Sequence, residues 1–357
     1  MKVQRIARVA IATAAVFGLA AGGVVAPASA ASRATVVIVT SNALTGLNPS
    51  VSGFNLTFNT SVAYLGGMGF NYYDNKPALI DNKVFGTYKV VSQKPFRVKY
   101  TVNPGRVWSD GTPITGVDLL LSHVLASSSY SAIAGLGDPK DSNVSPAFNS
   151  GGYGGTYDEH AVGLPQLSSD KMSVTVEYDA AIPDWQINGP GPSPVHTLVL
   201  LAEGKKGLQS AAVNSAARAK FEKAFYAYDK TLLAKIGKVW SNDYNINKVD
   251  GNTNPLLLVS NGAYLVQGAV PNSSVTLMLN PKYNSGPKTS GIKTIIYKVI
   301  GDGTAAAQAL ANKEVDVYQG QPTADAVNQL KAIPGVSVIG GDQAVYEHID
   351  LRVGPAY

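Results

Sequence analysis

The stretch from Ile292 to Tyr318, IKTIIYKVIGDGTAAAQALANKEVDVY, joins a strand pattern to a helix pattern and then to a second strand pattern. Its first part, Ile292–Ile300, is rich in β-branched side chains and predicts a buried strand. An Ala-rich segment follows, which predicts a helix capped by Thr304 and ending at Asn312. Val315–Tyr318 then predicts a short strand.

The same alternation continues on both sides of this stretch. Downstream, Thr323 is expected to cap a helix that ends at Lys331, and Val336–Ile339 predicts another strand. Far upstream, the β-branched run Thr35–Thr40 (TVVIVT) is typical of a strand buried on both faces of a sheet. The order β-α-β-α-β is typical of a parallel or mixed sheet covered by helices, so the sequence predicts an α/β fold.

Periodicity indicates further elements in the middle of the chain. Alternating apolar residues predict three strands, at Phe96–Val102, Val174–Tyr178 and Val275–Leu279. We expect Thr35–Thr40 to pair in one sheet with the last of these or with the strand that begins the quoted stretch. Residues at helical spacing predict a helical stretch over Ala211–Ile236.

Local signals define a turn and a helix start in the first half of the chain. The segment Trp108–Pro113 (WSDGTP) predicts a tight turn from its Asp-Gly pair and its proline. Thr115 and Asp118 follow at the spacing of a capping box, so a helix is expected to begin there. Residues 51–82, by contrast, are irregular and rich in Asn, Gly and Tyr, and they predict no long helix.

The N-terminus has the three parts of a secretory signal. Lys2, Arg5 and Arg8 form a positive region, Val9–Ala21 is apolar, and Ala28–Ala30 resembles a cleavage site. We therefore expect an exported protein, located in a periplasm or outside the cell. The alternative is an uncleaved N-terminal anchor, although the apolar part is shorter than the ~20 residues that a membrane span needs.

Composition narrows the classes of function. The chain has no cysteine, which excludes disulfides, a thiolate metal site, a cysteine nucleophile and a lipid-bearing cysteine. Its 29 basic and 24 acidic side chains give a formal net charge of only +5, and three of the basic residues lie in the leader, so a nucleic-acid partner is not expected. We expect a monomer without a cofactor.

Signals for catalysis and for metal binding are weak. The nucleophile elbow, the His-Glu-x-x-His helix and the phosphate-binding loop are all missing from the sequence. Four scattered histidines include one in Asp158–His160, which we interpret as a solvated loop because three adjacent residues do not easily face one ion. We therefore expect no catalytic residue and no metal site. A secreted hydrolase and an adhesion or interaction protein stay open as alternatives.

Three segments together resemble one protein family. They are Phe96–Asp118, with its Ser-Asp-Gly-x-Pro turn; Ser260–Tyr283, with Asn-Gly-Ala-Tyr and Asn-Pro-x-Tyr; and Ile295–Tyr318, with Glu-Val-Asp. These segments are similar to the signature stretches of solute-binding protein family 5, the oligopeptide, dipeptide and nickel class of ABC importers. The resemblance implies a protein that captures a peptide or other small solute and delivers it to ABC permease subunits, and that is not an enzyme.

The resemblance also implies a domain organisation. Family members have a two-lobed, periplasmic-binding-protein-like fold of type II with an inserted subdomain, and the lobes close over the solute. On this basis residues 1–30 are the signal peptide, residues 31–48 and 163–300 form a discontinuous lobe I, and residues 49–162 are the insertion. Residues 301–357 begin lobe II, which is expected to be incomplete because family members usually continue further.

The position of the strands predicts part of the binding site. Ligands of open α/β sheets bind outside the carboxyl ends of the strands. The segments that follow two predicted strands contain Asn42, Leu44 and Gln321, which we therefore expect to line the cleft. An extended peptide held there would form strand-like hydrogen bonds through its backbone.

The family resemblance implies three more ligand-binding residues. Asn261 is expected to contact ligand through its amide, with the capping of a turn before Gly262 as the alternative role. Tyr283 is expected to face the cleft, with packing in the core as the alternative. Tyr130 lies where the family's insertion approaches the ligand, with a surface aromatic as the alternative.

Overall fold

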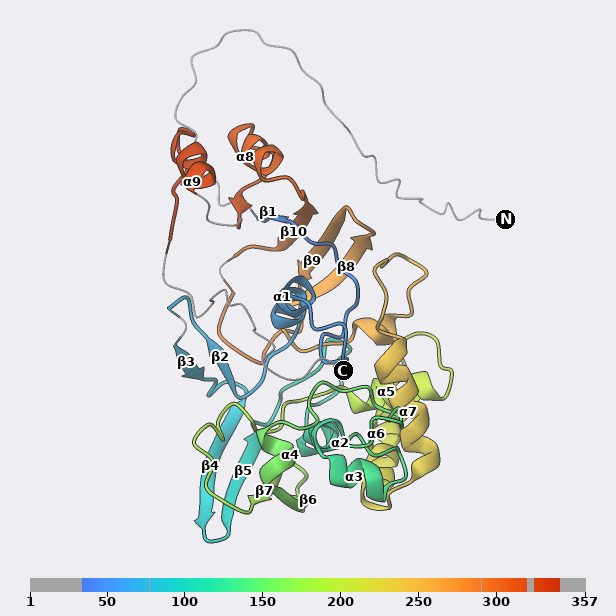
Figure 1. Cartoon of the computed structure of the whole chain (residues 1–357). Coiled ribbons are helices and arrows are strands. Elements are labelled where there is room, and N and C mark those ends of the chain that lie inside the picture. The colour runs from blue at the N-terminus through green and yellow to red at the C-terminus, as the bar shows by residue number, and fades with distance from the viewer. Residues whose placement is uncertain (1–33, 77, 290, 320–323, 341–357) are drawn as a thin grey trace, which may run out of the picture. The chain divides into compact units, whose positions relative to one another are not determined.

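The computed structural model describes residues 34–340 except 77, 290 and 320–323 (Figure 1). Within these residues the strands form a five-stranded sheet, a four-stranded sheet and a small hairpin. The hairpin consists of β2 (Asn71–Tyr73) and β3 (Leu79–Asp81). No helix in this part of the chain is both long enough and apolar enough to span a membrane.

The five-stranded sheet is mixed, as predicted. Its strands are β1 (Thr35–Thr40), β8 (Tyr264–Val270), β9 (Ser274–Leu279), β10 (Thr294–Val299) and β11 (Val317–Tyr318), in the order β11-β1-β10-β9-β8. The strand β1, second in this order, is parallel to both of its neighbours, whereas β9 is antiparallel to β10 and β8. The predicted pairing of Thr35–Thr40 with the strand near Ile292 is confirmed, with Thr35 opposite Thr294.

Helices cover both faces of this sheet because side chains alternate along β1. Val36 and Ile38 pack with α1 (Thr57–Gly66), whose Phe58 and Val62 are buried. Val37 and Val39 point the other way and pack with α8 (Gly303–Ala311) through Ala306 and Ala309. The helix α1 was not expected from the irregular sequence of residues 51–82, since it has no side-chain cap and no charged residue in its end turns.

The four-stranded sheet is antiparallel throughout. It contains β4 (Gly86–Gln93), β5 (Phe96–Val102), β6 (Ala161–Leu167) and β7 (Ser173–Tyr178), in the order β4-β5-β7-β6. Phe96, Val98, Tyr100 and Val102 of β5 are buried, and the residues between them are partly exposed. The predicted strands at Phe96 and Val174 are therefore confirmed.

A group of helices completes the core around this sheet. They are η1 (Gly116–Leu119), α2 (Leu120–Ala126), α3 (Ser128–Ile133), α4 (Thr156–His160), α5 (Val195–Ala202), α6 (Ala211–Tyr226), α7 (Lys230–Asn242) and η2 (Pro255–Leu258). The predicted helical stretch Ala211–Ile236 is helical, but it is divided into two helices because the chain turns between α6 and α7. Tyr228 there has φ of 51°, and the Asp229 side chain accepts a hydrogen bond from the Leu232 N–H at 3.1 Å and caps α7.

The outer edge of β6 is occupied by a side chain from α6. The Tyr226 hydroxyl donates to the Pro165 carbonyl at 2.9 Å and accepts from the Leu167 N–H at 3.2 Å. Gly163 in the same strand has φ of 62°, and the pairing with β7 shifts between Val162 and Gln166. The backbone groups of Pro165 and Leu167 that face away from β7 therefore bond within the chain.

Strand pairing bears on how the chain divides into parts. The segment 163–300, predicted as part of lobe I, contributes strands to both sheets. Its β7 pairs with β5, which belongs to the predicted insertion, in the four-stranded sheet. Its β8, β9 and β10 belong to the five-stranded sheet that contains β1. The segment after residue 301 contributes β11 to the sheet of β1 as well. The exact lobe boundaries stay a prediction.

Two details of the predicted C-terminal pattern differ from the structure, and a third is not tested by it. The helix α8 is capped by Asp302 and not by Thr304, because the Asp302 carboxylate accepts from the Ala305 N–H at 2.7 Å. Val336–Ile339 forms no strand. The helix α9 (Ala324–Lys331) is present, whereas its predicted cap, Thr323, lies outside the described residues.

Exchange of Asp302 for alanine tests this cap. Asp302→Ala removes the acceptor for the Ala305 N–H, and loss of such a cap costs about 1 kcal/mol. We expect amide hydrogen exchange in α8 to accelerate about fivefold relative to the unchanged chain. Thr304→Ala is the matched control and should leave exchange at Ala305 unchanged. Equal acceleration in the two variants would contradict the assignment.

Candidate functional site

The carboxyl end of β1 forms an exposed edge. Ser41 and Asn42 are exposed there, and the Asn42 N–H donates to the Thr40 hydroxyl at 3.3 Å. The Asn42 side chain bonds to its neighbour, with Nδ2 donating to Ser41 Oγ at 3.4 Å. Leu44, two residues on, is buried against α1 in the core of the five-stranded sheet. At this edge Asn42 thus faces solvent and Leu44 does not.

Two more predicted ligand residues lie elsewhere. Tyr130 is 1% exposed, its hydroxyl donates to the Phe225 carbonyl at 2.8 Å, and its ring stacks on the Phe225 ring with centroids 5.0 Å apart. These contacts place Tyr130 inside the helical core. Gln321 lies outside the described residues. The ligand roles of Asn42, Leu44, Tyr130 and Gln321 stay predictions.

Asn261 is buried and bonds to backbone on both sides of its amide. Its Oδ1 accepts from the Met68 N–H at 3.1 Å, and its Nδ2 donates to the Met68 carbonyl at 2.8 Å. Both bonds cross 193 positions in the sequence, to the segment that follows α1. The structure therefore gives the Asn261 amide a backbone partner for both its donor and its acceptor.

Tyr283 is half-buried close to that same segment. A Cβ built on Gly286 would lie 2.4 Å from the Tyr283 hydroxyl and 3.1 Å from the Met68 side chain, so both side chains reach over this glycine. Burial, with a smaller contribution from nearby Tyr72, raises the pKa of Tyr283 to about 12. Tyr283 therefore stays a neutral hydroxyl at physiological pH.

A cavity of about 300 Å³ lies where the two main clusters of buried side chains meet. Val62 and Val266 line it from the side of the five-stranded sheet, and Leu198 and Trp240 line it from the helical core. Asn261 also lines this cavity. A second hollow of about 480 Å³ lies between β6 and α6, where Lys171 and Glu222 form an ion pair at 2.7 Å.

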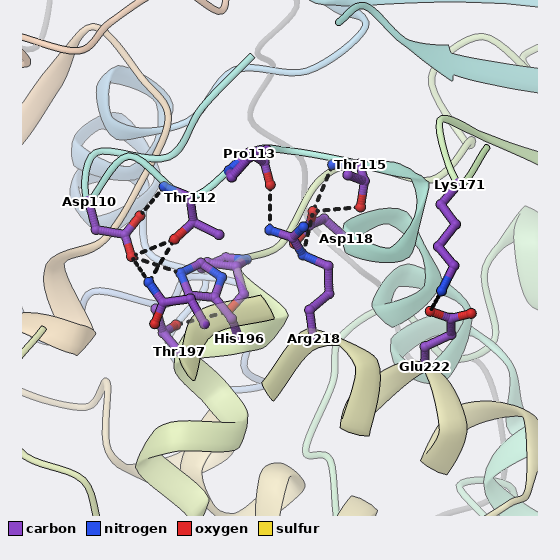
Figure 2. A network of polar contacts seen from close by, with 12 residues as sticks. Asp110, Thr112, Pro113, Thr115, Asp118, Lys171, His196, Thr197, Arg218 and Glu222 are labelled. Carbon is purple, nitrogen blue, oxygen red and sulfur yellow. Dashed lines mark hydrogen bonds and ion pairs between the residues drawn. The ribbon is translucent and has the colours of Figure 1, made fainter. Parts of the chain in front are cut away.

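The predicted turn is held by a buried polar network, shown in Figure 2. The Asp110 carboxylate accepts from the Thr112 N–H at 2.9 Å, from His196 Nε2 at 3.0 Å and from Asn214 Nδ2 at 3.0 Å. Burial alone would raise the pKa of Asp110, but the hydrogen bonds from His196 and Thr112 outweigh it, so the pKa is lowered. Asp110 is therefore ionised, and α5 and α6 supply its partners.

The same network contains a second buried acid. Asp118 accepts from the Thr115 N–H at 2.8 Å, which is one half of the predicted capping box, and Arg218 Nε lies 3.7 Å from its Oδ2. Burial raises the pKa of Asp118 and the Arg218 charge opposes the rise. Arg218 also donates to the Pro113 carbonyl, so one side chain of α6 contacts both the turn and the helix start.

The Asp110–His196 pair is enclosed within the fold. The His196 side chain is fully buried, and within the described residues its Nδ1 has no hydrogen-bond partner. A general base must reach the proton that it abstracts, and this ring reaches no solvent. The network therefore supports the fold of the turn.

The Asp158–His160 segment is likewise used within the fold. Asp158 accepts from the Ser128 N–H at 2.7 Å and the Gly154 N–H at 2.9 Å, and His160 Nδ1 lies 2.9 Å from Asp179 Oδ1. Across the part of the chain that the structure describes, no cluster of three His, Asp or Glu side chains suited to a metal ion is found.

Comparison with known families identifies the chain's relatives. The family described as bacterial extracellular solute-binding proteins, family 5, middle region, matches residues 76–355. The chain belongs to this family. The resemblance seen in the sequence is thereby confirmed, and the family is one of solute-binding proteins. No match was found among curated proteins.

Solved structures similar to this family 5 chain share its fold. The periplasmic EDTA-binding protein EppA has a TM-score of 0.61 and 20% identity, over 84% of this chain and 46% of that one. The oligopeptide-binding protein AppA from Bacillus subtilis, in complex with a nonapeptide, has a TM-score of 0.55 and 14% identity, over 84% and 46%. NikZ from Campylobacter jejuni, in complex with Ni(L-His), has a TM-score of 0.53 and 14% identity, over 84% and 46%.

These matches confirm the predicted α/β, two-lobed periplasmic-binding-protein fold. At these low sequence identities the matches are evidence for the fold and for no other property. The family 5 chain spans about half the length of the structures that it matches.

Sequence reasoning missed several of the residues that hold this part of the family 5 fold. His196, Asn214 and Arg218 contact the turn from more than 80 positions away, and no local pattern marks them. Asn82 and Asn280 are buried amides that bond to backbone. Asn280 belongs to the Asn-Pro-x-Tyr motif, so its place in that motif was a signal that could have drawn attention to it.

Proposed function

We propose that this chain captures a small solute outside the cytoplasm and delivers it to the permease subunits of an ABC importer. The observation that carries this proposal is the family match over residues 76–355. The fold supports it, since the carboxyl end of β1 is exposed at Asn42, where α/β sheets bind ligands. The leader-like sequence of residues 1–30 supports export to a periplasm or to the exterior.

Peptides are the solute class that we propose. A similar structure holds a nonapeptide, and another, an oligopeptide-binding protein from Thermus thermophilus with a TM-score of 0.51, holds a pentapeptide. An extended peptide would bond through its backbone beside the exposed carboxyl end of β1 at Asn42. Metal–amino-acid complexes and chelators are the competing classes, because other similar structures are described by Ni(L-His) and EDTA.

The chemistry of the described residues supports binding without turnover. The His196 side chain is fully buried, and the hydroxyls beside Asp110 and Asp118, those of Thr112 and Thr115, donate to these carboxylates within the fold. We therefore propose a monomeric binding protein without enzymatic activity or cofactor. Peptide that is recovered intact after incubation would agree with this, whereas peptide cleavage lost on exchange of one histidine or acid would contradict it.

Ligand-induced thermal stabilisation tests the solute class. A ligand present at 100 times its Kd adds about 2.7 kcal/mol to the free energy of unfolding. We expect a mixture of short peptides to raise the Tm of the purified chain, with sugars as the negative control. A rise only with Ni–histidine or EDTA would refute the peptide class, and no rise with any of these solutes would contradict solute capture.

A further inference from the structure

The segment that follows α1 is held by two buried asparagines from distant parts of the chain. Asn261 bonds to both backbone groups of Met68, as described above. Asn82, which follows β3, uses its amide nitrogen to bond the Gly69 carbonyl at 2.8 Å and the Ser285 carbonyl at 2.8 Å. Residues 66–69 are therefore fixed to the loop before β8 on one side and to the segment after β9 on the other.

A third buried asparagine closes the arrangement. Asn280 Nδ2 donates to the Gly262 carbonyl at 3.0 Å, and its Oδ1 accepts from the Lys282 N–H at 2.9 Å. The Gly262 N–H in turn donates to the Gly66 carbonyl at 2.7 Å. All three asparagines are 2–3% exposed, so each amide is shielded from water and each bond has no solvent competitor.

These bonds converge on Tyr283 and its surroundings. The Tyr283 N–H donates to the Asn280 carbonyl at 3.0 Å. Met68, fixed by Asn261, packs over Gly286 beside the Tyr283 hydroxyl. Ser285, fixed by Asn82, precedes that glycine. The backbone on both sides of Tyr283 is thus bonded to one of the three asparagines.

We propose that Asn82, Asn261 and Asn280 form an asparagine clasp, a set of positioning residues that fixes the Met68 backbone and the loop of Tyr283 and so shapes the solute-facing surface. The solute-facing part of this inference rests on the proposed function. The clasp changes the expected role of Asn261 from a direct ligand contact to a positioning residue. The donor and the acceptor of its amide both bond to Met68, so Asn261 acts on solute through the Met68 backbone. The clasp also links two parts of the fold. On one side are α1 and β8, which pack in the core of the five-stranded sheet, and on the other is the segment of Asn82, which leads into β4 of the four-stranded sheet.

The chemistry of the amides allows a graded test. Asn261 and Asn280 each use one donor and one acceptor, and a protonated carboxyl group offers the same pair. Asn82 uses two donor bonds, to Gly69 and Ser285, and a protonated carboxyl group offers only one donor. Asparagine-to-aspartate variants should therefore differ in how much of their protection from amide hydrogen exchange returns at acidic pH.

The experiment measures amide hydrogen exchange in Asn261→Asp and Asn82→Asp, each compared with the unchanged chain at the same pH. At pH 8 the ionised carboxylate faces a carbonyl, so we expect the protection of the Met68 N–H to fall about tenfold or more in both variants. At pH 5 we expect Asn261→Asp to recover most of its protection and Asn82→Asp to recover little. Exposed Asn252→Asp is the matched control and should behave as the unchanged chain at both pH values.

Further variants and readouts keep the test decisive. If Asn261→Asp does not fold at pH 8, Asn280→Asp replaces it, with the same acid recovery expected and exchange followed at Lys282. Normal Met68 protection in Asn261→Asp together with lost solute binding would overturn the clasp and make Asn261 a direct ligand contact. Equal recovery of the Asn261 and Asn82 variants would also overturn it. If the unchanged chain binds no solute, the proposed function fails, while the exchange pattern still decides whether the clasp exists.

Discussion

The Gly262→Ala variant is expected to lose about 3 kcal/mol or more of its free energy of unfolding, or to fail to fold. A Cβ at this position would lie 2.2 Å from the Gly66 backbone carbon and 2.4 Å from the Leu65 carbonyl oxygen. Both are backbone atoms at the end of α1, so no flexible side chain can move aside. Forcing extra volume into a packed site displaces side chains and backbone and typically costs 1–3 kcal/mol, and occasionally more.

Chemical denaturation with Gly251→Ala as control measures this effect. Gly251 has no atom within 4 Å of the position of an added Cβ, so its exchange should change the free energy of unfolding by less than about 0.5 kcal/mol. A Gly262→Ala variant as stable as this control would show that the α1 end and the loop before β8 do not approach as described.

Removal of the Arg218 side chain is expected to have the second large effect. Arg218→Met leaves the fully buried Asp118 carboxylate without its cation and removes the bond to Pro113. Loss of one partner from a buried ion pair typically costs 3–5 kcal/mol at neutral pH. Lys220→Met on the same helix removes an exposed pair with Glu203, and it should cost less than about 1 kcal/mol.

The cost of Arg218→Met should also depend on pH. Burial already raises the pKa of Asp118, and loss of Arg218 raises it further. An unfolded aspartate releases its proton near pH 3.9, so above that pH the folded variant holds a proton that the unfolded chain has lost. Stability therefore falls as pH rises through this interval, and we expect the deficit against the unchanged chain to be larger at pH 8 than at pH 5. A deficit equal at both pH values would contradict the ionised pair.

Short-range patterns predicted the elements in which the order of apolar and polar residues matches the order of buried and exposed side chains. Phe96–Val102 alternates in sequence and in burial, and Thr35–Thr40 packs one set of side chains on each face of its sheet. Asp118 bonds to Thr115 three positions away, which local spacing can indicate.

Elements that depend on distant contacts were not predicted. The helix α1 has an uncharged sequence without a cap, and the strands that bury its Phe58 and Val62 include β8, β9 and β10, which lie more than 200 positions away. The break between α6 and α7 depends on the conformation of Tyr228 and on the cap formed by Asp229, within a sequence that is continuously helical in pattern. Helix propensity is a weak prior that such contacts override.

The candidate site shows the same division. Asn42 and Leu44 were chosen from the end of β1, and the structure does place Asn42 on an exposed edge. The partners of Asn261, however, lie 193 positions away, and a motif names the residue without showing what it contacts. Its hydrogen bonds could be learned only from the three-dimensional arrangement.

The contact of Tyr226 with β6 has a consequence for how molecules of this protein meet one another at high concentration. An unpaired strand edge is a template on which a second chain can add a strand and begin an aggregate. Here one phenolic hydroxyl takes both the Pro165 carbonyl and the Leu167 N–H, and the Gly163 irregularity disturbs the register of the same strand. The Tyr226 side chain thus leaves fewer backbone groups of β6 free to pair with a strand of a neighbouring molecule, and at this edge it opposes extension of the sheet.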